Sequence, residues 1–278
     1  MSTKEAQEVA FWITEREAIR IAKEREKPRP WTTDPILKEY RFCNVRREDD
    51  AVTKWIAANW RNPNYDHPML LRAMALARMV NWPPTLDIIG FPETWHPEAV
   101  VNAINSQASC GKAWGSAYIV STNGRAMSKA LYVVYEVCGK LPATPLPARA
   151  TSSLQAFYNS LLVYNGLGSF MAGQLIADLK NTPGHPLEEA PDWWSWACPG
   201  PGSKRGLARY FKGRDGEPTF ELGMEVMMDE VGALLPKHIG RIHAQDWQNV
   251  MCEMGKYWRT KDGRGRPKAR YTPNPTFP

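Results

Sequence analysis

The sequence predicts an all-α fold, and two observations carry this prediction. Apolar residues recur at helical spacing along much of the chain, as in "AVTKWIAANW" at 51–60, where they fall on one face. Strand-like alternation of apolar and polar residues is confined to the short patch "AYIVST" at 117–122. The 278 residues are 43% hydrophobic, which is enough to form a substantial core.

The predicted helices are separated by proline and glycine. A charged amphipathic helix covers 5–27 and ends before Pro28, and a second helix follows the cap-like residues 31–34. Further helices are expected over 46–60, 68–82, 96–107, 129–141 and 153–165. We expect one helical catalytic domain over residues 1–261, with a division into two lobes left open. A basic, Gly/Pro-rich and partly extended tail follows over 262–278.

Composition restricts the class of protein. Lysine and arginine outnumber aspartate and glutamate by 35 to 29, and the resulting net charge of +6 favours a polyanionic partner. The five cysteines lie far apart without a CxxC pair, so we expect reduced, mostly buried thiols in a cytoplasmic protein. The sequence shows no signal core and no apolar run of membrane-spanning length. The scattered histidines favour no metal site, and no cofactor is expected.

The segment "LLVYNGLGSFMAGQLIADL" at 161–179 predicts two helices joined by a Gly-Leu-Gly turn. It resembles the helix-hairpin-helix of DNA repair glycosylases, in which glycines let the backbone approach a DNA phosphate. Gly166 and Gly168 are therefore expected to contact DNA, although an ordinary helical hairpin with a glycine cap would look the same. Asp192 falls near the place of the glycosylases' catalytic aspartate. Phe170 replaces the nucleophilic lysine of the bifunctional enzymes, so a lyase is not expected.

A second turn, in "WACPGPGSKRGLARYF" at 196–211, combines glycine and proline with basic side chains. Such a turn delivers backbone N–H groups and positive charge to one place, as an anion site requires. The expected ligands of a pyrophosphate, or of a DNA phosphate, are Ser203, Lys204, Arg205 and Arg209. The alternative is an ordinary solvated loop.

Five segments between residues 42 and 271 carry a resemblance to one family. They read "FCNVRREDDAVTKWI", "GSFMAGQLIADL", "WACPGPGSKRGLARYF", "CEMGKYWR" and "GRPKARY". In these segments the chain resembles the α-glutamyl/putrescinyl thymine pyrophosphorylases of bacteriophages, which include amino acid:DNA transferases. The resemblance implies a glycosylase-like helical fold whose helical module also occurs in 5-hydroxymethyluracil DNA kinases. The GxxxxGK[ST] motif is absent from the 278 residues, so kinase activity is not expected.

The reaction implied by the resemblance is a substitution on double-stranded DNA in a phage-infected bacterial cell. An amino acid or polyamine replaces the pyrophosphate of 5-pyrophosphoryloxymethyl-uracil, a base made with the help of a 5-hydroxymethyluracil DNA kinase. Carried over by position, the matching polar residues are Asn44, Arg47, Glu48, Asp50, Gln174, Asp178, Ser203, Arg205, Arg209, Glu253, Lys256, Lys268 and Arg270. Two positions depart from the family: Gly173 stands where an aromatic is expected, and Gly255 where an aspartate is expected. Both changes are expected to open space in the substrate pocket.

This chemistry assigns further roles. The target base must leave the duplex and stack in a pocket, for which we expect Asn44, Arg47, Gln174, Trp196 and Lys256, with Trp193 and Trp194 as further aromatic walls. The attacking ammonium must lose a proton to a carboxylate, and the candidates are Asp178, Asp192 and Glu253. Each carboxylate has a structural alternative: an ion pair with a core arginine for Asp178, a helix cap for Asp192, and a bridge to Lys256 or Tyr257 for Glu253.

The tail residues are expected to follow the DNA backbone without reading its sequence: Arg264, Arg266, Lys268 and Arg270. Two other functions remain open at this point. One is a helix-hairpin-helix glycosylase that acts on a modified base, and the other is a helical DNA-binding protein without catalysis.

Overall fold

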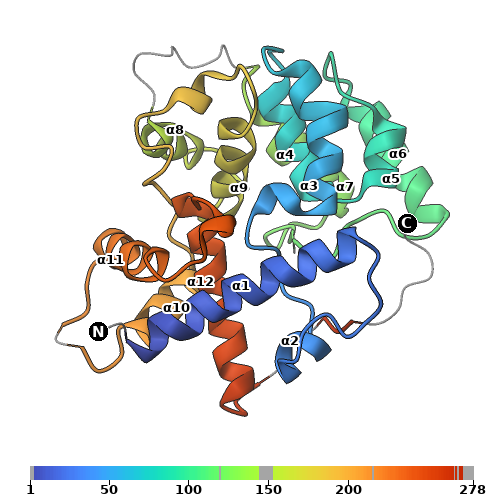
Figure 1. Ribbon diagram of the computed structural model, residues 1–278. Coiled ribbons are helices and arrows are strands. Elements are labelled where there is room, and N and C mark those ends of the chain that lie inside the picture. Colours follow the sequence, from blue (N-terminus) through green and yellow to red (C-terminus); the bar gives the residue numbers. More distant parts are fainter. Residues whose placement is uncertain are drawn as a thin grey trace. The chain divides into compact units, whose positions relative to one another are not determined.

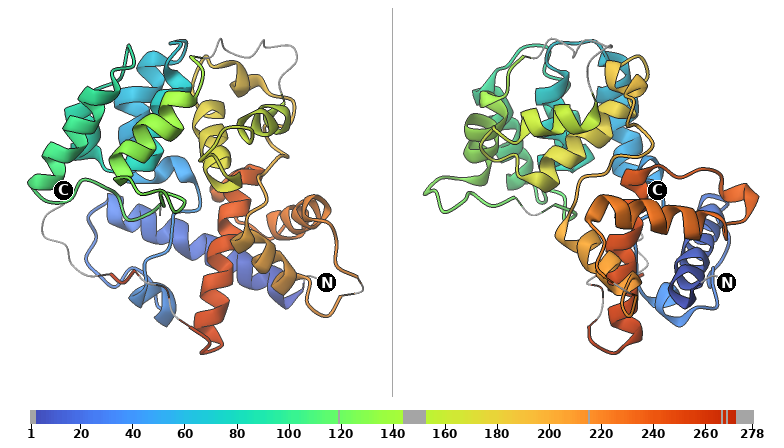
Figure 2. Two further views of the ribbon diagram at one scale, coloured as in Figure 1. Left: turned by 180° about the vertical axis from the view of Figure 1, so that it is seen from behind. Right: turned by 90° about the vertical axis from the view of Figure 1, so that its left-hand side faces the viewer.

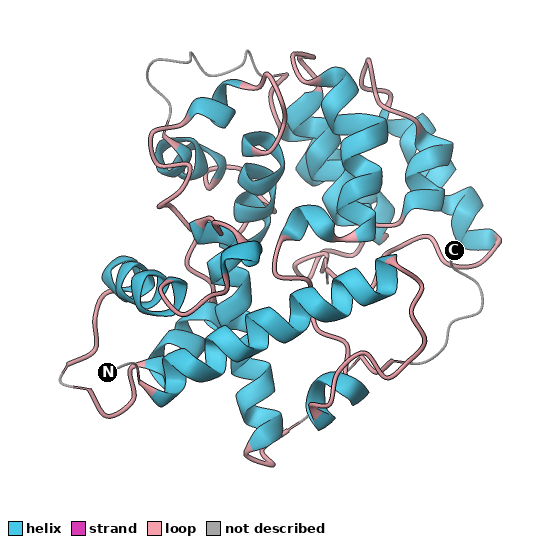
Figure 3. Ribbon diagram, viewed as in Figure 1, coloured by secondary structure: helices cyan, strands magenta, loops and turns pink. Residues whose placement is uncertain are grey.

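The computed structural model describes residues 3–118, 120–143, 153–214, 216–265, 267 and 269–271. Over these residues the chain is helical and contains no strand, as Figure 3 shows, so the all-α prediction is confirmed. The patch at 117–122 forms no strand in its described residues. None of the helices in the described ranges has the length and apolar character needed to cross a membrane.

The helices are labelled in Figure 1 and seen from two other sides in Figure 2. They group into two compact units. The terminal unit comprises residues 1–50 and 199–278, and the central unit comprises residues 51–198. Each unit has its own core of buried apolar side chains.

The terminal unit is built from both ends of the sequence. Its helices are α1 (Lys4–Glu24), α2 (Pro35–Glu39), α10 (Pro201–Tyr210), α11 (Phe220–Gly232) and α12 (Ala244–Lys261), with short 3₁₀ turns at Arg47–Asp49 and Lys237–Ile239. Side-chain oxygens of Thr3, Asp34 and Thr219 accept N–H bonds at the starts of α1, α2 and α11, as N-cap residues do. The cap at Thr219 is the signal that could have predicted α11 from the sequence.

The central unit is arranged around α4 (Leu70–Val80), whose side chains are buried at ten of eleven positions. Around it lie α3 (Ala51–Ile56), α5 (Pro83–Ile89), α6 (Pro97–Ser109), α7 (Lys129–Leu131), α8 (Leu154–Leu161) and α9 (Ser169–Lys180). The left-handed Asn81 ends α4, and prolines begin α5 and α6.

Two predicted helices are less regular than their apolar spacing indicates. The helix expected over 46–60 starts with the 3₁₀ turn Arg47–Asp49, becomes α3 at Ala51, and widens into a π-helical turn at Ala57–Arg61. The helix expected over 129–141 is α-helical for only Lys129–Leu131 and continues as a π-helical turn at Tyr132–Val137. A spacing pattern of a few residues cannot distinguish these turns from an α-helix.

Candidate functional site

The candidate site lies in the terminal unit, where α10 crosses α12. Gly200 caps α10 and Pro201 is its first residue, so the Gly-Pro pair begins a helix. A methyl group at Gly202 would collide with the Cys252 side chain, and one at Gly206 would collide with the Met251 carbonyl oxygen. The glycines of "GPGSKRG" therefore let two helix backbones meet closely.

Three cations gather at this crossing. Arg205 lies on α10 and is exposed, whereas Lys256 and Arg259 lie on α12. Burial and the Glu253 carboxylate raise the pKa of the Cys252 thiol, and the charges of Lys256, Arg205 and Arg259 act on it in the opposite direction. All three positive charges therefore act on one thiol, together with the Glu253 carboxylate. We call Lys256, Arg205 and Arg259 the cation triad.

Glu253 holds one member of the triad in place. Its carboxylate is buried, with one oxygen in an ion pair with the Lys256 ammonium. The other oxygen accepts a hydrogen bond from the backbone N–H of Cys43 at 3.2 Å. Burial by itself would lower the pKa of Lys256. The neighbouring Glu253 carboxylate outweighs this effect, so the pKa of Lys256 is raised. Lys256 therefore stays charged while its side chain is still 39% exposed.

The segment that supplies Cys43 is fixed from several sides. Asn44 accepts a hydrogen bond from the buried Arg16 at 3.2 Å and donates to the Asp50 carboxylate at 3.0 Å. Its backbone carbonyl accepts a bond from Asn249 on α12 at 3.2 Å. Asn44, Glu253, Lys256 and Arg205 thus lie in one neighbourhood, as the sequence predicts for parts of one site.

Arg47 lies beside the first turn of α12. Its backbone N–H donates to the Asp246 carboxylate at 3.1 Å, and its guanidinium is 3.8 Å from the Glu48 carboxylate. Asp246 precedes Glu253 by two helical turns, so Arg47 is at the edge of this neighbourhood.

The other predicted pyrophosphate ligands differ in their positions. Ser203 is buried, and its hydroxyl exchanges hydrogen bonds with Gly200 and accepts one from Gln248. Arg209 pairs with Asp262 at 2.8 Å and lies over the Trp258 ring. Lys204 is exposed. The Ser203 hydroxyl has the role of a helix cap, so of the four predicted ligands Arg205 best fits an anion bound at the crossing.

Asp178 lies in the core of the central unit and is fully buried. Its carboxylate accepts two hydrogen bonds from Arg78, at 2.7 and 2.5 Å, and is 3.7 Å from Arg61. Arg78 also donates to the Thr53 hydroxyl at 3.2 Å. This is the core ion pair that the sequence left open as an alternative, and its burial does not suit a base that must meet a substrate.

Asp192 caps a helix. Its two oxygens accept the backbone N–H groups of Leu154 and Gln155 at the start of α8, at 2.7 and 3.1 Å. This is the structural alternative foreseen for Asp192. Both carboxylate oxygens of Asp192 therefore accept N–H groups of the helix end, which such a start leaves without an intrahelical partner.

The tryptophans after Asp192 have different roles. Trp193 donates its indole N–H to the Lys180 carbonyl at 2.9 Å, and its ring lies beneath the Lys180 ammonium. The Trp196 ring packs on Tyr158, with centroids 5.1 Å apart. Trp194 is 40% exposed and is therefore the one of the three that is best placed to stack against a ligand.

Gln174 accepts a hydrogen bond from the Tyr118 hydroxyl at 3.0 Å, and the Tyr118 ring packs edge-on against the exposed Phe170. The expectation that Gly173 opens the pocket is wrong. Cys198 occupies that space, because a Cβ at Gly173 would lie 2.9 Å from the Cys198 Cβ. At Gly255 the nearest atom would be 3.8 Å away, so there the space is available.

The second helix predicted within 161–179 is present as α9, whereas the first, α8, ends at Leu161 and residues 162–168 form a longer turn than predicted. Gly166 has a left-handed φ of 85°, and a side chain there would strike Val137. Gly168 is the N-cap of α9 and is exposed, and a methyl group added there would meet no atom within 4 Å. The contact of this turn with a DNA phosphate stays a prediction.

The basic tail is described only in part. Arg264 is exposed, and Arg270 pairs with Glu39 at 3.3 Å and lies over the Tyr40 ring. The predicted DNA ligands Arg266 and Lys268 lie outside the described residues.

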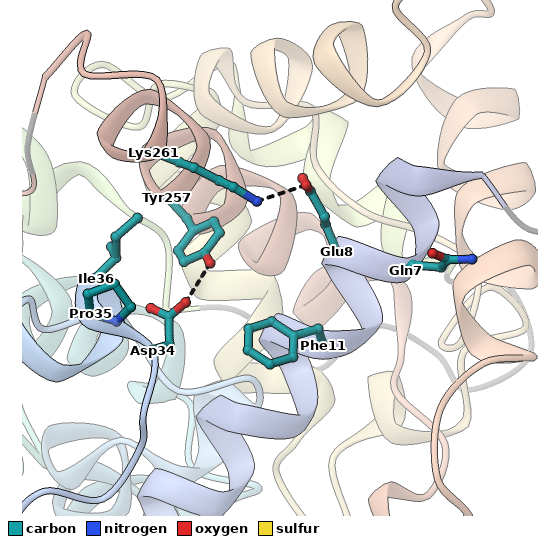
Figure 4. Close-up of a pocket in the computed structure, with 8 residues that line it drawn as sticks. All are labelled: Gln7, Glu8, Phe11, Asp34, Pro35, Ile36, Tyr257 and Lys261. Atoms are coloured by element: carbon teal, nitrogen blue, oxygen red, sulfur yellow. Dashed lines mark hydrogen bonds and ion pairs between the residues drawn. The ribbon is translucent and has the colours of Figure 1, made fainter.

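A shallow pocket of the terminal unit lies between α1, α2 and α12 (Figure 4). Two polar pairs cross it: Glu8 with Lys261 at 2.9 Å, and the Tyr257 hydroxyl with Asp34 at 2.8 Å. Phe11 lines the same pocket and is 46% exposed. Sequence patterns gave no sign of this pocket. Among the described residues, no three His, Cys, Asp or Glu side chains lie close enough together to hold a metal ion.

Comparison with known proteins identifies the family. The model of the family described as "5-hmdU DNA kinase, helical domain" matches residues 3–266. The chain belongs to this family. A 5-hmdU DNA kinase of Bacillus phage SP10 is 24% identical over 208 residues, which cover 67% of this chain and 33% of the relative. The chain therefore spans about a third of the length of that relative. No solved structure matches this chain.

Proposed function

We propose that this chain modifies thymine in bacteriophage DNA, as a transferase that replaces the pyrophosphate of 5-pyrophosphoryloxymethyl-uracil with an amino acid or amine. Membership in the helical-domain family of 5-hmdU DNA kinases supports a role in the modification of this base. The phage relative, whose name states that it is a 5-hmdU DNA kinase, supports the same context. The enzyme would act inside the infected cell, after a 5-hydroxymethyluracil DNA kinase has phosphorylated the base.

The observation that carries the proposal is the cation triad beside Glu253. Pyrophosphate leaves with several negative charges, and fixed positive charges at its position stabilise the departing group. Arg205 offers a forked set of donors, and Lys256 offers an ammonium whose charge is maintained by Glu253. The close crossing of α10 and α12 fixes these charges on two packed helices, which keeps them aimed before the substrate arrives.

The proposed step is a displacement at the 5-methylene carbon. The amine nitrogen forms a bond to this carbon, the carbon–oxygen bond breaks, and pyrophosphate departs with the electron pair. The amine loses one proton, which passes to a carboxylate. All three predicted bases are held in structural contacts: Asp178 with Arg78, Asp192 at the start of α8, and the buried Glu253 with Lys256 and the Cys43 N–H. Glu253 alone lies beside the cations, and we propose it for this role on that ground.

The test is an incubation of duplex DNA containing 5-pyrophosphoryloxymethyl-uracil with the protein and a pool of amino acids and polyamines. Nucleoside mass spectrometry should detect a new base heavier by the added amine, and free pyrophosphate should accumulate in equal amount. Abasic DNA would favour a glycosylase instead. An unchanged substrate with every amine would contradict the proposal and leave a DNA-binding protein without catalysis.

Adjacent residues of α10 provide a matched pair of variants. Arg205→Gln removes a charge of the triad, and we expect transfer to slow by about 10²–10³, as for the loss of one donor to a developing anion. Lys204→Gln removes an equal charge one position earlier, about 100° around the helix, and should have a much smaller effect. Equal rates for the two variants would argue against an anion site at the crossing.

A further inference from the structure

A second basic feature of the terminal unit is distinct from the cation triad. The exposed guanidinium of Arg29 lies between two aromatic rings, 4.8 Å from the Trp31 centroid and 4.9 Å from the Tyr271 centroid. The two rings meet edge-on at 5.6 Å. Arg29 also donates one hydrogen bond to the Tyr271 carbonyl at 3.2 Å. A guanidinium has five N–H donors, so stacking and one bond fix its orientation and leave donors for a ligand.

Other cations gather around the same rings. The Lys23 ammonium lies 5.9 Å from the Trp31 centroid. Burial lowers the pKa of Lys23, and so do the charges of Arg41, Arg16 and Arg29, while Asp50 acts in the opposite direction. Lys23, Arg29 and Arg41 are all exposed. Like charges held this close repel one another, and a polyanion would relieve the repulsion.

The end of the described chain holds this arrangement together. Tyr40 and Arg270 form an antiparallel bridge, flanked by hydrogen bonds from Arg41 N–H to the Ala269 carbonyl and from Tyr271 N–H to the Glu39 carbonyl. In Figure 1 this short stretch lies along the loop beside α2. Residues 269–271 thus act as a brace for the loop.

The brace also connects these cations to the candidate site. The Tyr271 hydroxyl accepts a hydrogen bond from Arg16 at 3.2 Å, and the same guanidinium donates to Asn44 and to the carbonyls of Phe42 and Cys43. Cys43 in turn donates to Glu253. A continuous set of hydrogen bonds therefore runs from the Arg29 stack to the residue that holds Lys256.

We propose that Lys23 and Arg29, ordered by the rings of Trp31 and Tyr271, bind the phosphate backbone of duplex DNA next to the candidate site, together with the nearby Arg41. The choice of DNA rests on the proposed function. Phosphate contacts of this kind carry no sequence information but set the position of the protein on the duplex. Binding through such contacts releases counterions and therefore weakens as salt is added.

The test measures the affinity of the full chain for a fluorescein-labelled, unmodified duplex by anisotropy over a series of salt concentrations. Arg29→Gln should weaken binding and lower the slope of log K against log salt by about 0.9, the value of one phosphate contact. Lys4→Gln removes an equal charge from the other end of α1, about 28 Å from Lys23 at 1.5 Å per residue, and should leave the slope unchanged.

Tyr271→Ala separates the brace from simple charge. It removes no charge, but it takes away one face of the Arg29 stack and the bond to Arg16, so we expect weaker binding. If Arg29→Gln and Tyr271→Ala both bound DNA like the unchanged chain, the proposal would be overturned.

This test does not depend on the proposed chemistry, because it uses unmodified DNA. Weakened binding by the variants, together with absence of transfer in the unchanged chain, would reject the transferase and retain the DNA surface. Normal binding by the variants with active transfer would reject the surface and retain the transferase.

Discussion

Two buried carboxylates, one in each unit, pair with cations that differ in their exposure to solvent. In the central unit, Asp178 is fully buried between Arg78 and Arg61. In the terminal unit, Glu253 is buried but its partner Lys256 remains 39% exposed. The comparison teaches that an acidic residue near basic ones is not by itself a site. A charged partner must also be able to reach a ligand.

Asp178→Asn tests the buried ion pair of this comparison and has the largest expected effect. The change keeps the shape of the side chain but leaves Arg78 in the core without its counter-charge. Loss of one partner of a buried ion pair costs about 3–5 kcal/mol, so we expect the free energy of unfolding to fall by that amount in urea titrations. Glu136→Gln, in an exposed pair with Lys140, should have a much smaller effect. Unchanged stability with lost transfer would instead identify Asp178 as the catalytic base.

Lys256→Met tests the other ion pair, in which the cation is partly exposed. Removal of the ammonium should slow transfer by about 10²–10³, because stabilisation of the departing pyrophosphate is lost. The loss of stability should be smaller than for Asp178→Asn, since the Lys256 side chain is partly in solvent. Lys261 lies on the same helix as Lys256, and Lys261→Met, which breaks an ion pair with Glu8 of α1, is the control and should transfer at the normal rate. Comparable rates for both variants would remove Lys256 from the site.

The central unit should respond to acid through the buried His185. Burial lowers the pKa of His185 from 6.5 to about 4, and its ring nitrogen accepts the Leu187 N–H. The unfolded chain binds a proton near pH 6.5 while the folded chain does not. The stabilisation from the neutral ring is therefore complete above pH 6.5 and is lost as pH falls to 4, by up to about 3 kcal/mol.

His185→Gln measures this contribution. The difference in unfolding free energy between this variant and the unchanged chain should vary with pH between 6.5 and 4. His238→Gln, at an exposed position of the terminal unit, should leave the pH dependence as it is. A pH-independent difference for His185→Gln would show that the buried ring titrates normally.

The smallest expected effect concerns the helix crossing that positions the triad. Gly206→Ala places a methyl group against the Met251 carbonyl, and overpacking of this kind costs about 1–3 kcal/mol. It should also displace Arg205 and slow transfer. Gly255→Ala is the matched control on α12, because its nearest neighbour would be 3.8 Å away. Equal unfolding midpoints for the two variants would contradict the close crossing.

Local sequence signals predicted most helices correctly but not their regularity. Apolar spacing identified α4 and α9, whose buried faces are long enough to show the period. It could not foresee that residues 132–137 form a π-helical turn, because that choice depends on neighbouring packing. The turn between α8 and α9 followed from Gly166 and Gly168, but α8 already ends at Leu161, and the left-handed Gly166 lies within the turn.

The candidate site was predicted in part. The segments that resemble the thymine-modifying family include Asn44, Arg205, Glu253 and Lys256, which lie in one neighbourhood of the terminal unit. Arg259 was missed, although it stands at the end of the quoted segment "CEMGKYWR", three residues after Lys256 on the same helix. The roles of these residues remain predictions that the transfer assay tests.

The sequence by itself determined the helical class, the positive charge and the residue types of the candidate site, because these depend on composition and local spacing. Tertiary structure decided which candidates are available to a ligand. In the sequence, nothing distinguishes the acids Asp178 and Asp192 or the hydroxyl of Ser203 from groups that could meet a ligand. Arg78, the start of α8 and Gln248, all far away in the chain, engage them in ion pairs and caps. Burial and long-range partners set the reactivity of a polar group, and neither can be read from its sequence neighbours.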